Sequence, residues 1–164
     1  MPKIFNIDFS ATTSVSSVSK PLVSDLNNIS YNDLGKNLLV AGQFLGYDKY
    51  SGCIVRSFSG GSRDDSFVVN DGFVANDTSF TSTYVYDIQI DSLGNYYVGG
   101  SFTTYNGVSA NRIIKLTTGG TIDYTFNYGT GFNSDVRTMS IQTDGKILVG
   151  GFLHHIMVLV VIIL

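Results

Sequence analysis

Short runs of alternating apolar and polar residues, separated by glycine-containing turns, follow one another along most of the chain. In one such run, Val136 to Gln142, the side chains alternate, and Asp144-Gly145 follows shortly after it. An Asp-Gly pair between two such runs is typical of a two-residue hairpin, because a type I′ turn needs positive φ at both central positions. Lys146 to Gly151 is the returning run. The pattern therefore predicts a β-hairpin over 136–151.

An earlier part of the chain predicts two further strands of the same unit. Asn106-Gly107 marks a turn, and Asn111 to Leu116 follows it as a third strand. Gly119-Gly120 turns the chain again, and Thr121 to Phe126 is the fourth predicted strand. Four short strands in about 50 residues match the size of one β-propeller blade.

The unit is repeated along the chain. Residues 54–73 have matching residues 59 positions later, and residues 85–94 have matching residues 51 positions later. The difference of eight residues is a loop insertion in the first repeat, within 74–84. Three segments carry the clearest copies, each with a turn, an apolar run and a final Phe: 33–44, 92–102 and 143–152.

The repeat divides the chain into five parts. These are an N-terminal strand with a Ser/Thr-rich tether, two repeats, a partial third repeat and an apolar tail: 1–25, 26–84, 85–135, 136–152 and 153–164. Two to three blades cannot close a propeller, which needs about four or more. We therefore expect an all-β fold, an incomplete β-propeller made of four-stranded antiparallel blades. Five glycines inside predicted strands indicate close backbone approach rather than a phosphate-binding loop: Gly42, Gly99, Gly100, Gly150 and Gly151.

The anchors of the repeat resemble a known family. They read Asp-Gly-Lys-Ile-Leu-Val-Gly-Gly at 144–151, Phe-Thr-x-Tyr-Asn-Gly at 102–107, Ile-x-Lys-Leu at 113–116 and Gly-x-Ile-Asp-x-x-Phe at 120–126. This pattern is similar to the delta-60 repeat, and the resemblance covers residues 26–152. It implies a β-propeller found in large bacterial surface proteins and in some phage proteins, without a shared catalytic site.

Composition agrees with a strand-rich chain. All 13 acidic residues are Asp, only four residues are Ala, and 18 are Gly, whereas helix interiors favour Glu and Ala. The net charge of −3 and the scattered Lys and Arg argue against a nucleic-acid surface. Cys53 is the single cysteine, so the chain cannot form an internal disulfide or a thiol-rich metal site.

The two ends of the chain differ from the repeats. Met1 to Lys20 lacks a basic start followed by an apolar run, so we do not interpret it as a secretory signal; a virion or cell-surface location fits the family resemblance. Ile156 to Leu164 is apolar but far shorter than the roughly 20 residues of a membrane helix. We expect it to form an added hydrophobic strand or helix that is prone to self-association.

We interpret the tail at 153–164 as a shifted reading frame of a third repeat. Codons permitted by this tail, read one base out of frame, give Phe-Thr-Ser-Tyr-Asn-Gly-Val-Ser-Ser-Asn-x-Ile, which is close to residues 102–113. On this interpretation His154 and His155 originate from the shifted frame, and we assign no metal site to them.

The aspartates allow two functional alternatives. Pairs of carboxylates could serve glycoside chemistry in a carbohydrate-active propeller enzyme. Asn70-Asp71-Gly72 and Asn76-Asp77 could instead bind calcium in an adhesin, although their spacing does not match an EF-hand. We favour turn chemistry, because the aspartates concerned sit beside Gly, Asn or Ser: Asp64, Asp65, Asp71, Asp77, Asp91 and Asp144.

The sequence therefore predicts a binding or structural repeat module with no enzymatic activity and no cofactor, within a larger surface or virion (tail-associated) protein. The expected partner is a protein or a surface glycan, and self-association could occur through open blade edges or the apolar tail. Exposed aromatic residues on a rigid scaffold are typical contact residues. We predict that five tyrosines at or near loops contact the partner: Tyr47, Tyr50, Tyr84, Tyr86 and Tyr105.

Overall fold

The computed structural model describes residues 23–32, 37–45, 52–58, 62–75, 83–151 and 160–162. Every regular element in this part of the chain is a β-strand, as the composition predicts. The N-terminal strand that the sequence predicts before the Ser/Thr-rich tether lies outside the described residues, as do both histidines. The strands are β1 (Val23–Asn32), β2 (Asn37–Leu45), β3 (Gly52–Phe58), β4 (Phe73–Val74), β5 (Val85–Ile90), β6 (Tyr96–Gly100), β7 (Thr104–Tyr105), β8 (Val108–Ser109), β9 (Ile113–Leu116), β10 (Val136–Ile141), β11 (Ile147–Gly151) and β12 (Val160–Ile162).

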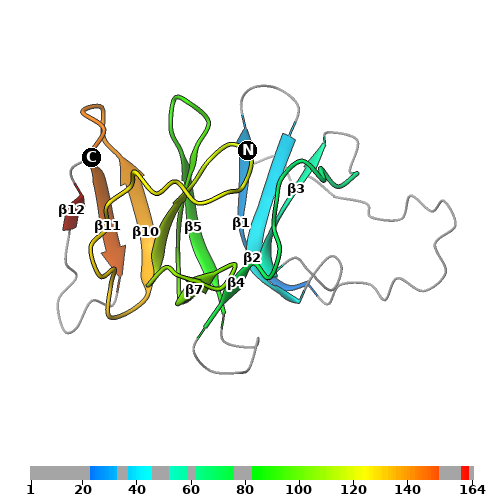
Figure 1. Ribbon diagram of the computed structural model, residues 1–164, viewed down its shortest axis with the longest axis horizontal. Helices are drawn as coiled ribbons and strands as arrows, with labels where there is room; N and C mark the ends of the chain where they lie inside the picture. The colour runs from blue at the N-terminus through cyan, green and yellow to red at the C-terminus, as the bar shows by residue number, and fades with distance from the viewer. Residues whose placement is uncertain are drawn as a thin grey trace, which may run out of the picture.

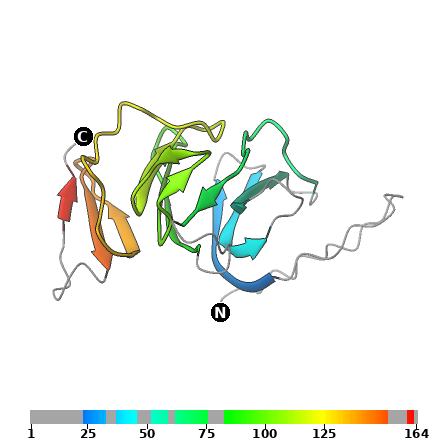
Figure 2. The ribbon, with the colours of Figure 1, turned by 60° about the horizontal axis from the view of Figure 1, so that its bottom comes forward.

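Three antiparallel sheets lie side by side in chain order (Figure 1). We call them blade 1 (β1-β2-β3), blade 2 (β5-β6-β9) and blade 3 (β10-β11-β12), and we call the first strand of each its inner strand. The inner strand β5 packs against β1 and β2 of blade 1, and β10 packs against β5 and β6 of blade 2. One stacking rule therefore joins successive blades. Figure 2 shows blades 1 and 3 at opposite ends of the row.

The predicted blade is confirmed in three of its four strands. β10, β11 and β9 lie where strands were expected, but the sequence after β9 forms a single bridge between Leu116 and Ile122. The fourth strand predicted at Thr121 to Phe126 is therefore wrong. Beyond the bridge the chain turns, because Phe126 N–H donates to Asp123 O at 3.2 Å and Thr125 N–H donates to the Asp123 carboxylate. Within the described residues each blade is a three-stranded sheet.

The turn at Asp144-Gly145 also differs from the prediction. Gly145 has a φ of 84°, but Asp144 is not among the residues with positive φ, so the turn is not type I′. Gly145 N–H donates to Gln142 O at 3.0 Å, and Gln142 N–H donates to Lys146 O at 2.7 Å. This is the pattern of a three-residue loop whose last residue is a left-handed glycine. A type I′ turn does occur at Asn106-Gly107, where φ is 50° and 77°.

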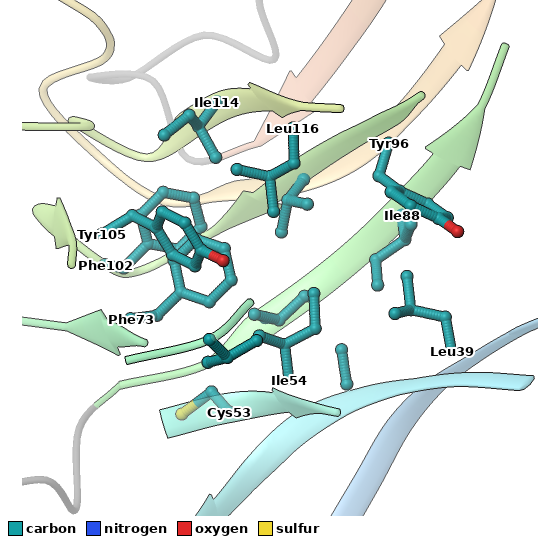
Figure 3. Packing of buried hydrophobic residues seen from close by; sticks show 14 of the residues in the cluster. Leu39, Cys53, Ile54, Phe73, Ile88, Tyr96, Phe102, Tyr105, Ile114 and Leu116 are labelled. Atoms are coloured by element: carbon teal, nitrogen blue, oxygen red, sulfur yellow. The ribbon is translucent and has the colours of Figure 1, made fainter. Parts of the chain in front are cut away.

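The apolar core lies between the blades. One cluster joins blades 1 and 2 and includes Leu39, Ile54 and Tyr96, all without exposed surface (Figure 3). A second cluster joins blades 2 and 3 and includes Tyr97 of blade 2 with Val136 and Ile147 of blade 3. Apolar residues therefore alternate between the two faces of blade 2, as expected for a sheet that is covered on both sides.

Gly100 and Gly151, in the middle strands of blades 2 and 3, allow close backbone approach at the start of the inner strands β5 and β10, as predicted for these two glycines. A Cβ added at Gly100 would lie 2.1 Å from Tyr84 O, and one added at Gly151 would lie 2.0 Å from Asp135 O. Gly100 and Gly151 are 51 positions apart, as are Tyr84 and Asp135. The same backbone contact is therefore built twice by the repeat.

The end of the chain adds a strand to blade 3, in agreement with one of the two forms expected for the apolar tail. β12 pairs with β11 through Leu148 and Val161, in the position that β9 takes on β6. Val161 thus stands where blade 2 has Lys115, the partner of Tyr97. Residues 152–159 and 163–164 lie outside the described residues, so the interpretation of 153–164 as a frameshift stays a prediction.

Candidate functional site

An aromatic and basic cluster lies where the inner strands β5 and β10 begin. Tyr84 and Tyr86 are two residues apart, so they lie on one side of the strand, and their rings stack in parallel at 5.4 Å between centroids. The Arg137 guanidinium carbon lies 3.9 Å from the centroid of the Tyr86 ring. Such a short distance over an aromatic face is a favourable cation–π contact. The cluster therefore joins two neighbouring blades through side chains.

Two arginines of this cluster flank one carboxylate. Arg137 Nη2 lies 3.1 Å from the Asp135 carboxylate, and Arg112 Nε lies 4.0 Å from it. Arg112 also donates from Nη1 to the carbonyls of Ser101, at 2.7 Å, and Phe102, at 3.0 Å. With two cations and one anion, the cluster carries one net positive charge. We call the five residues of this cluster the axial cluster: Tyr84, Tyr86, Arg112, Asp135 and Arg137.

Backbone geometry holds Arg112 in place. Its φ of 69° lies in the left-handed region, which is uncommon outside glycine. Cys53, the residue that matches Arg112 at a displacement of 59, has a φ of 65°. The conformation therefore recurs at the start of the third strand in blades 1 and 2, and it is not peculiar to Arg112.

The axial cluster can stack on a flat group and can donate hydrogen bonds to it. Burial raises the pKa of Tyr86, with Arg137 acting in the opposite direction, so its hydroxyl stays protonated at neutral pH. The Arg137 side chain keeps 43% of its surface exposed. The axial cluster thus combines aromatic and charged groups, and its Arg137 side chain is accessible to solvent.

Sequence reasoning found the tyrosines of the axial cluster and missed its charged residues. Tyr84 and Tyr86 were predicted, whereas Arg112, Asp135 and Arg137 were not. The missed signal was the repeat, because Arg137 and Asp135 lie 51 positions after Tyr86 and Tyr84. Of the other predicted contacts, Tyr47 and Tyr50 lie outside the described residues.

The prediction that Tyr105 is exposed is wrong. Its side chain is 0% exposed and packs on Phe73 at 4.6 Å between ring centroids (Figure 3). The hydroxyl donates to Gly120 O at 2.7 Å, and burial raises the pKa of Tyr105 well above its ordinary value. Tyr105 lies in β7, and its ring belongs to the apolar cluster between blades 1 and 2 rather than to the surface.

Replacing Tyr105 with Phe is expected to lower the free energy of unfolding by about 1–3 kcal/mol, because the buried carbonyl of Gly120 loses its donor. Urea unfolding followed by circular dichroism measures this difference. Tyr124→Phe is the matched control, since Tyr124 is 79% exposed, and it should leave the midpoint unchanged. An equal effect of both changes would contradict the role of the buried hydroxyl.

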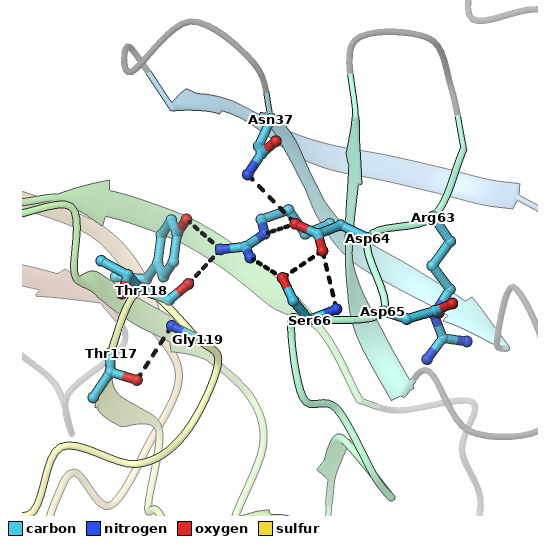
Figure 4. A network of polar contacts seen from close by, with 10 residues as sticks. Asn37, Arg63, Asp64, Asp65, Ser66, Thr117, Thr118 and Gly119 are labelled. Carbon is cyan, nitrogen blue, oxygen red and sulfur yellow. Dashed lines mark hydrogen bonds and ion pairs between the residues drawn. The ribbon is translucent and has the colours of Figure 1, made fainter.

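A second polar network is buried between blades 1 and 2 (Figure 4). Arg56 Nε donates to the Asp64 carboxylate at 2.8 Å, and the Asp64 side chain is 2% exposed. Arg56 Nη1 also donates to Thr118 O of blade 2, and Nη2 donates to Ser66 Oγ at 3.2 Å. The guanidinium therefore connects the turn after β3 to the turn after β9.

Blade 2 contains a version of this network with lysine. Lys115 Nζ lies 3.0 Å from the Asp123 carboxylate and 3.8 Å from that of Asp91. Lys115 and Asp123 lie 59 positions after Arg56 and Asp64. Hydrogen bonds from Thr125 and the contact with Lys115 lower the pKa of Asp123. Burial alone would lower the pKa of Lys115, but Asp123 and Tyr97 raise it. The pair is therefore ionised at neutral pH.

The remaining predicted carboxylates that are described lie in turns or at the surface. Asp91 accepts the N–H groups of Leu93 and Asn95, each at 2.9 Å. Asp144 accepts Lys146 N–H at 3.1 Å. Asp65 and Asp71 are exposed, and Asp77 lies outside the described residues. Within the described part of the chain, no group of three or more His, Cys, Asp or Glu residues is placed to hold a metal ion.

Comparison with known proteins agrees with the architecture. A family model described as a domain of unknown function (DUF5122) β-propeller matches residues 94–126, which contain β6 to β9 and the bridge at Ile122. No curated protein and no solved structure matches the chain. Among the described residues, no helix could cross a membrane. The antiparallel all-β fold and the matched model together support a β-propeller family.

Proposed function

We propose that this chain is a module for binding or support, without enzymatic activity, built from delta-60-type repeats of a β-propeller in a larger surface or virion protein. The observation that carries this proposal is the use of the carboxylates. Asp64 and Asp123 each hold a basic residue and a turn of their blade, and Asp91 and Asp144 each hold a hairpin turn. These acidic residues serve the scaffold.

The competing function is glycoside hydrolysis by two carboxylates. One pair that can be compared with that arrangement is Asp91 and Asp123, which both lie near the Lys115 ammonium group. A glycosidase needs one carboxylic acid that stays protonated, with a raised pKa. The pKa of Asp123 is instead lowered, and the ammonium group lies between the two carboxylates. This arrangement favours a structural ion pair over acid catalysis.

The axial cluster is the surface that supports a binding role. It combines stacked tyrosines with an exposed arginine at the start of two inner strands, and rigid strands fix both groups. Aromatic faces pack on sugar rings and on flat protein groups, while arginine pairs with acidic ones. A surface glycan or an acidic protein segment fits this chemistry.

Replacing Tyr86 with Ala is expected to weaken glycan binding about tenfold, because the stack between Tyr84 and Arg137 is lost. The measurement is binding of the labelled chain to a glycan array that includes uronic and sialic acids. Tyr124→Ala removes an exposed tyrosine away from the cluster and should bind like the unchanged chain. Equal binding by both variants would exclude the axial cluster as the glycan site, and release of sugars from the array would support the enzyme instead.

A further inference from the structure

Among the described residues, the blades stack by one rule, and the outer surface of the first and of the last blade in the row has no neighbouring blade. Blade 2 covers blade 1 by placing its inner strand β5 on β1 and β2, and blade 3 covers blade 2 by placing β10 on β5 and β6. By the same rule, a following inner strand would lie on β10 and β11. Within this row, β1 is the inner strand that no earlier blade precedes.

Gly99 lies on the face of blade 2 that blade 3 covers. A Cβ added at Gly99 would lie 2.5 Å from Val136 Cγ1 and 3.2 Å from the Met139 side chain, both in the next blade. The matching glycine of blade 3 is Gly150, 51 positions later. Of the described residues, only Thr138 lies within 4 Å of a Cβ added there, and Thr138 belongs to blade 3 itself. The small residue is present in blade 3, but the inner strand that it would accommodate is not among the described residues.

The face of β10 and β11 that contains Gly150 has residues similar to those of the blade 2 face that blade 3 covers. On blade 2, the covered face has cross-strand pairs of a polar residue with a small or aromatic one, Asp87 with Gly99 and Gln89 with Tyr97. Directly opposed residues share one face of a sheet. On blade 3, the corresponding pairs are formed by four residues: Thr138 with Gly150 and Ser140 with Leu148. Polar residues on this face are therefore compatible with burial, and the Asp87 carboxylate accepts Met139 N–H across the covered interface.

We infer that the face formed by β10 and β11 binds blade 1 of a second copy of this chain, with β1 as the docking strand. The interface continues the contact already made twice within the chain. The described blades of two copies then number six, which is within the usual range of four to eight for closed propellers. A twofold axis makes both junctions between the two copies identical. This inference rests on the proposed propeller architecture and names its partner.

The test is the mass of the full chain in solution, measured by light scattering after size exclusion across a dilution series. We expect a dimer, at twice the 17.8 kDa of the chain. Ser140→Arg places an unpaired charge on the proposed face, where Ser140 is exposed in the single chain, and should weaken dimerisation at least about tenfold. Thr143→Arg adds the same charge in the neighbouring turn and should leave the dimer intact.

Each other result overturns the two-copy ring. A monomer at every concentration, or open oligomers of growing size, excludes it. A dimer that persists in Ser140→Arg places the interface elsewhere, for example on the apolar tail. Circular dichroism of each variant confirms that the blades are folded. Glycan binding by a folded monomer would retain the proposed binding role while excluding the ring, so the two proposals fail separately.

Discussion

Replacing Asp64 with Ala is expected to lower the free energy of unfolding by about 3–5 kcal/mol, the usual cost of removing one partner of a buried ion pair. The change leaves the Arg56 guanidinium buried between blades 1 and 2 without its counter-charge. It also removes the carboxylate that accepts Ser66 N–H at 3.0 Å and so holds the turn after β3. The measurement is the midpoint and slope of urea unfolding.

Asp65→Ala is the matched control for this change. Asp65 is the next residue, pairs with Arg63 at 3.2 Å, and has a side chain that is 87% exposed. Exposed ion pairs contribute little to stability. Its removal should therefore leave the midpoint unchanged. Asp123→Ala, at the less buried copy of the network, should cause a loss of unfolding free energy between those of Asp65→Ala and Asp64→Ala. A loss as large in Asp65→Ala as in Asp64→Ala would refute the role assigned to the buried pair.

The same pair gives stability a pH dependence. Burial alone would raise the pKa of Asp64, but hydrogen bonds from Ser66 and the charge of Arg56 outweigh it, so the pKa falls below its ordinary value of 3.8. A lowered pKa in the folded chain means that the stabilisation is complete above the unfolded value and is lost as pH falls through the folded one. Unfolding scans below pH 4 should therefore show a steeper loss in the unchanged chain than in Asp64→Ala.

Replacing Gly100 with Ala is expected to destabilise the chain by about 3 kcal/mol or more, at or beyond the upper end of overpacking effects. The added methyl group would lie 2.1 Å from the carbonyl oxygen of Tyr84 and 2.8 Å from the Phe102 ring. The obstacle is backbone rather than the tip of a flexible side chain, so the junction between β6 and the start of β5 must open. Thermal and urea unfolding measure the loss.

Gly119→Ala separates this clash from the general effect of replacing a glycine. At Gly119 the added Cβ would meet only Thr117 Oγ1, at 3.8 Å, and φ is not positive. Its stability should stay close to that of the unchanged chain. If Gly100→Ala were equally well tolerated, the close approach of Gly100 to Tyr84 would not be a constraint on the fold.

Sequence reasoning was most reliable where the repeat could be counted. The displacements of 59 and 51 predicted which residues occupy matching places, and the structure gives matching residues the same contacts, as in Arg56 with Asp64 and Lys115 with Asp123. Alternation predicted the strand pair over 136–151. These features depend on local patterns that recur, so the repeats within this one chain can be aligned with each other.

The errors arose where tertiary contacts decide the outcome. Thr121 to Phe126 has the alternation of a strand, but the Asp123 carboxylate draws the backbone into a turn after one bridge. Tyr105 is next to a turn and yet fully buried, because its ring packs against Phe73 in the apolar cluster between blades 1 and 2. The axial cluster brings together residues from two blades, and no single segment of sequence displays that proximity.

The match between Tyr86 and Arg137 has a consequence for how such a surface can change. Both residues occupy the same place in successive repeats, yet one is aromatic and the other is a cation. The blade holds that place fixed through backbone contacts such as Gly100 with Tyr84 and Gly151 with Asp135, in which neither side chain takes part. A gene that duplicates this repeat therefore copies a fixed backbone in which at least two partly exposed positions, those of Tyr84 and Tyr86, can differ between blades. New recognition chemistry can arise by point substitution at these positions, without altering the backbone that displays them.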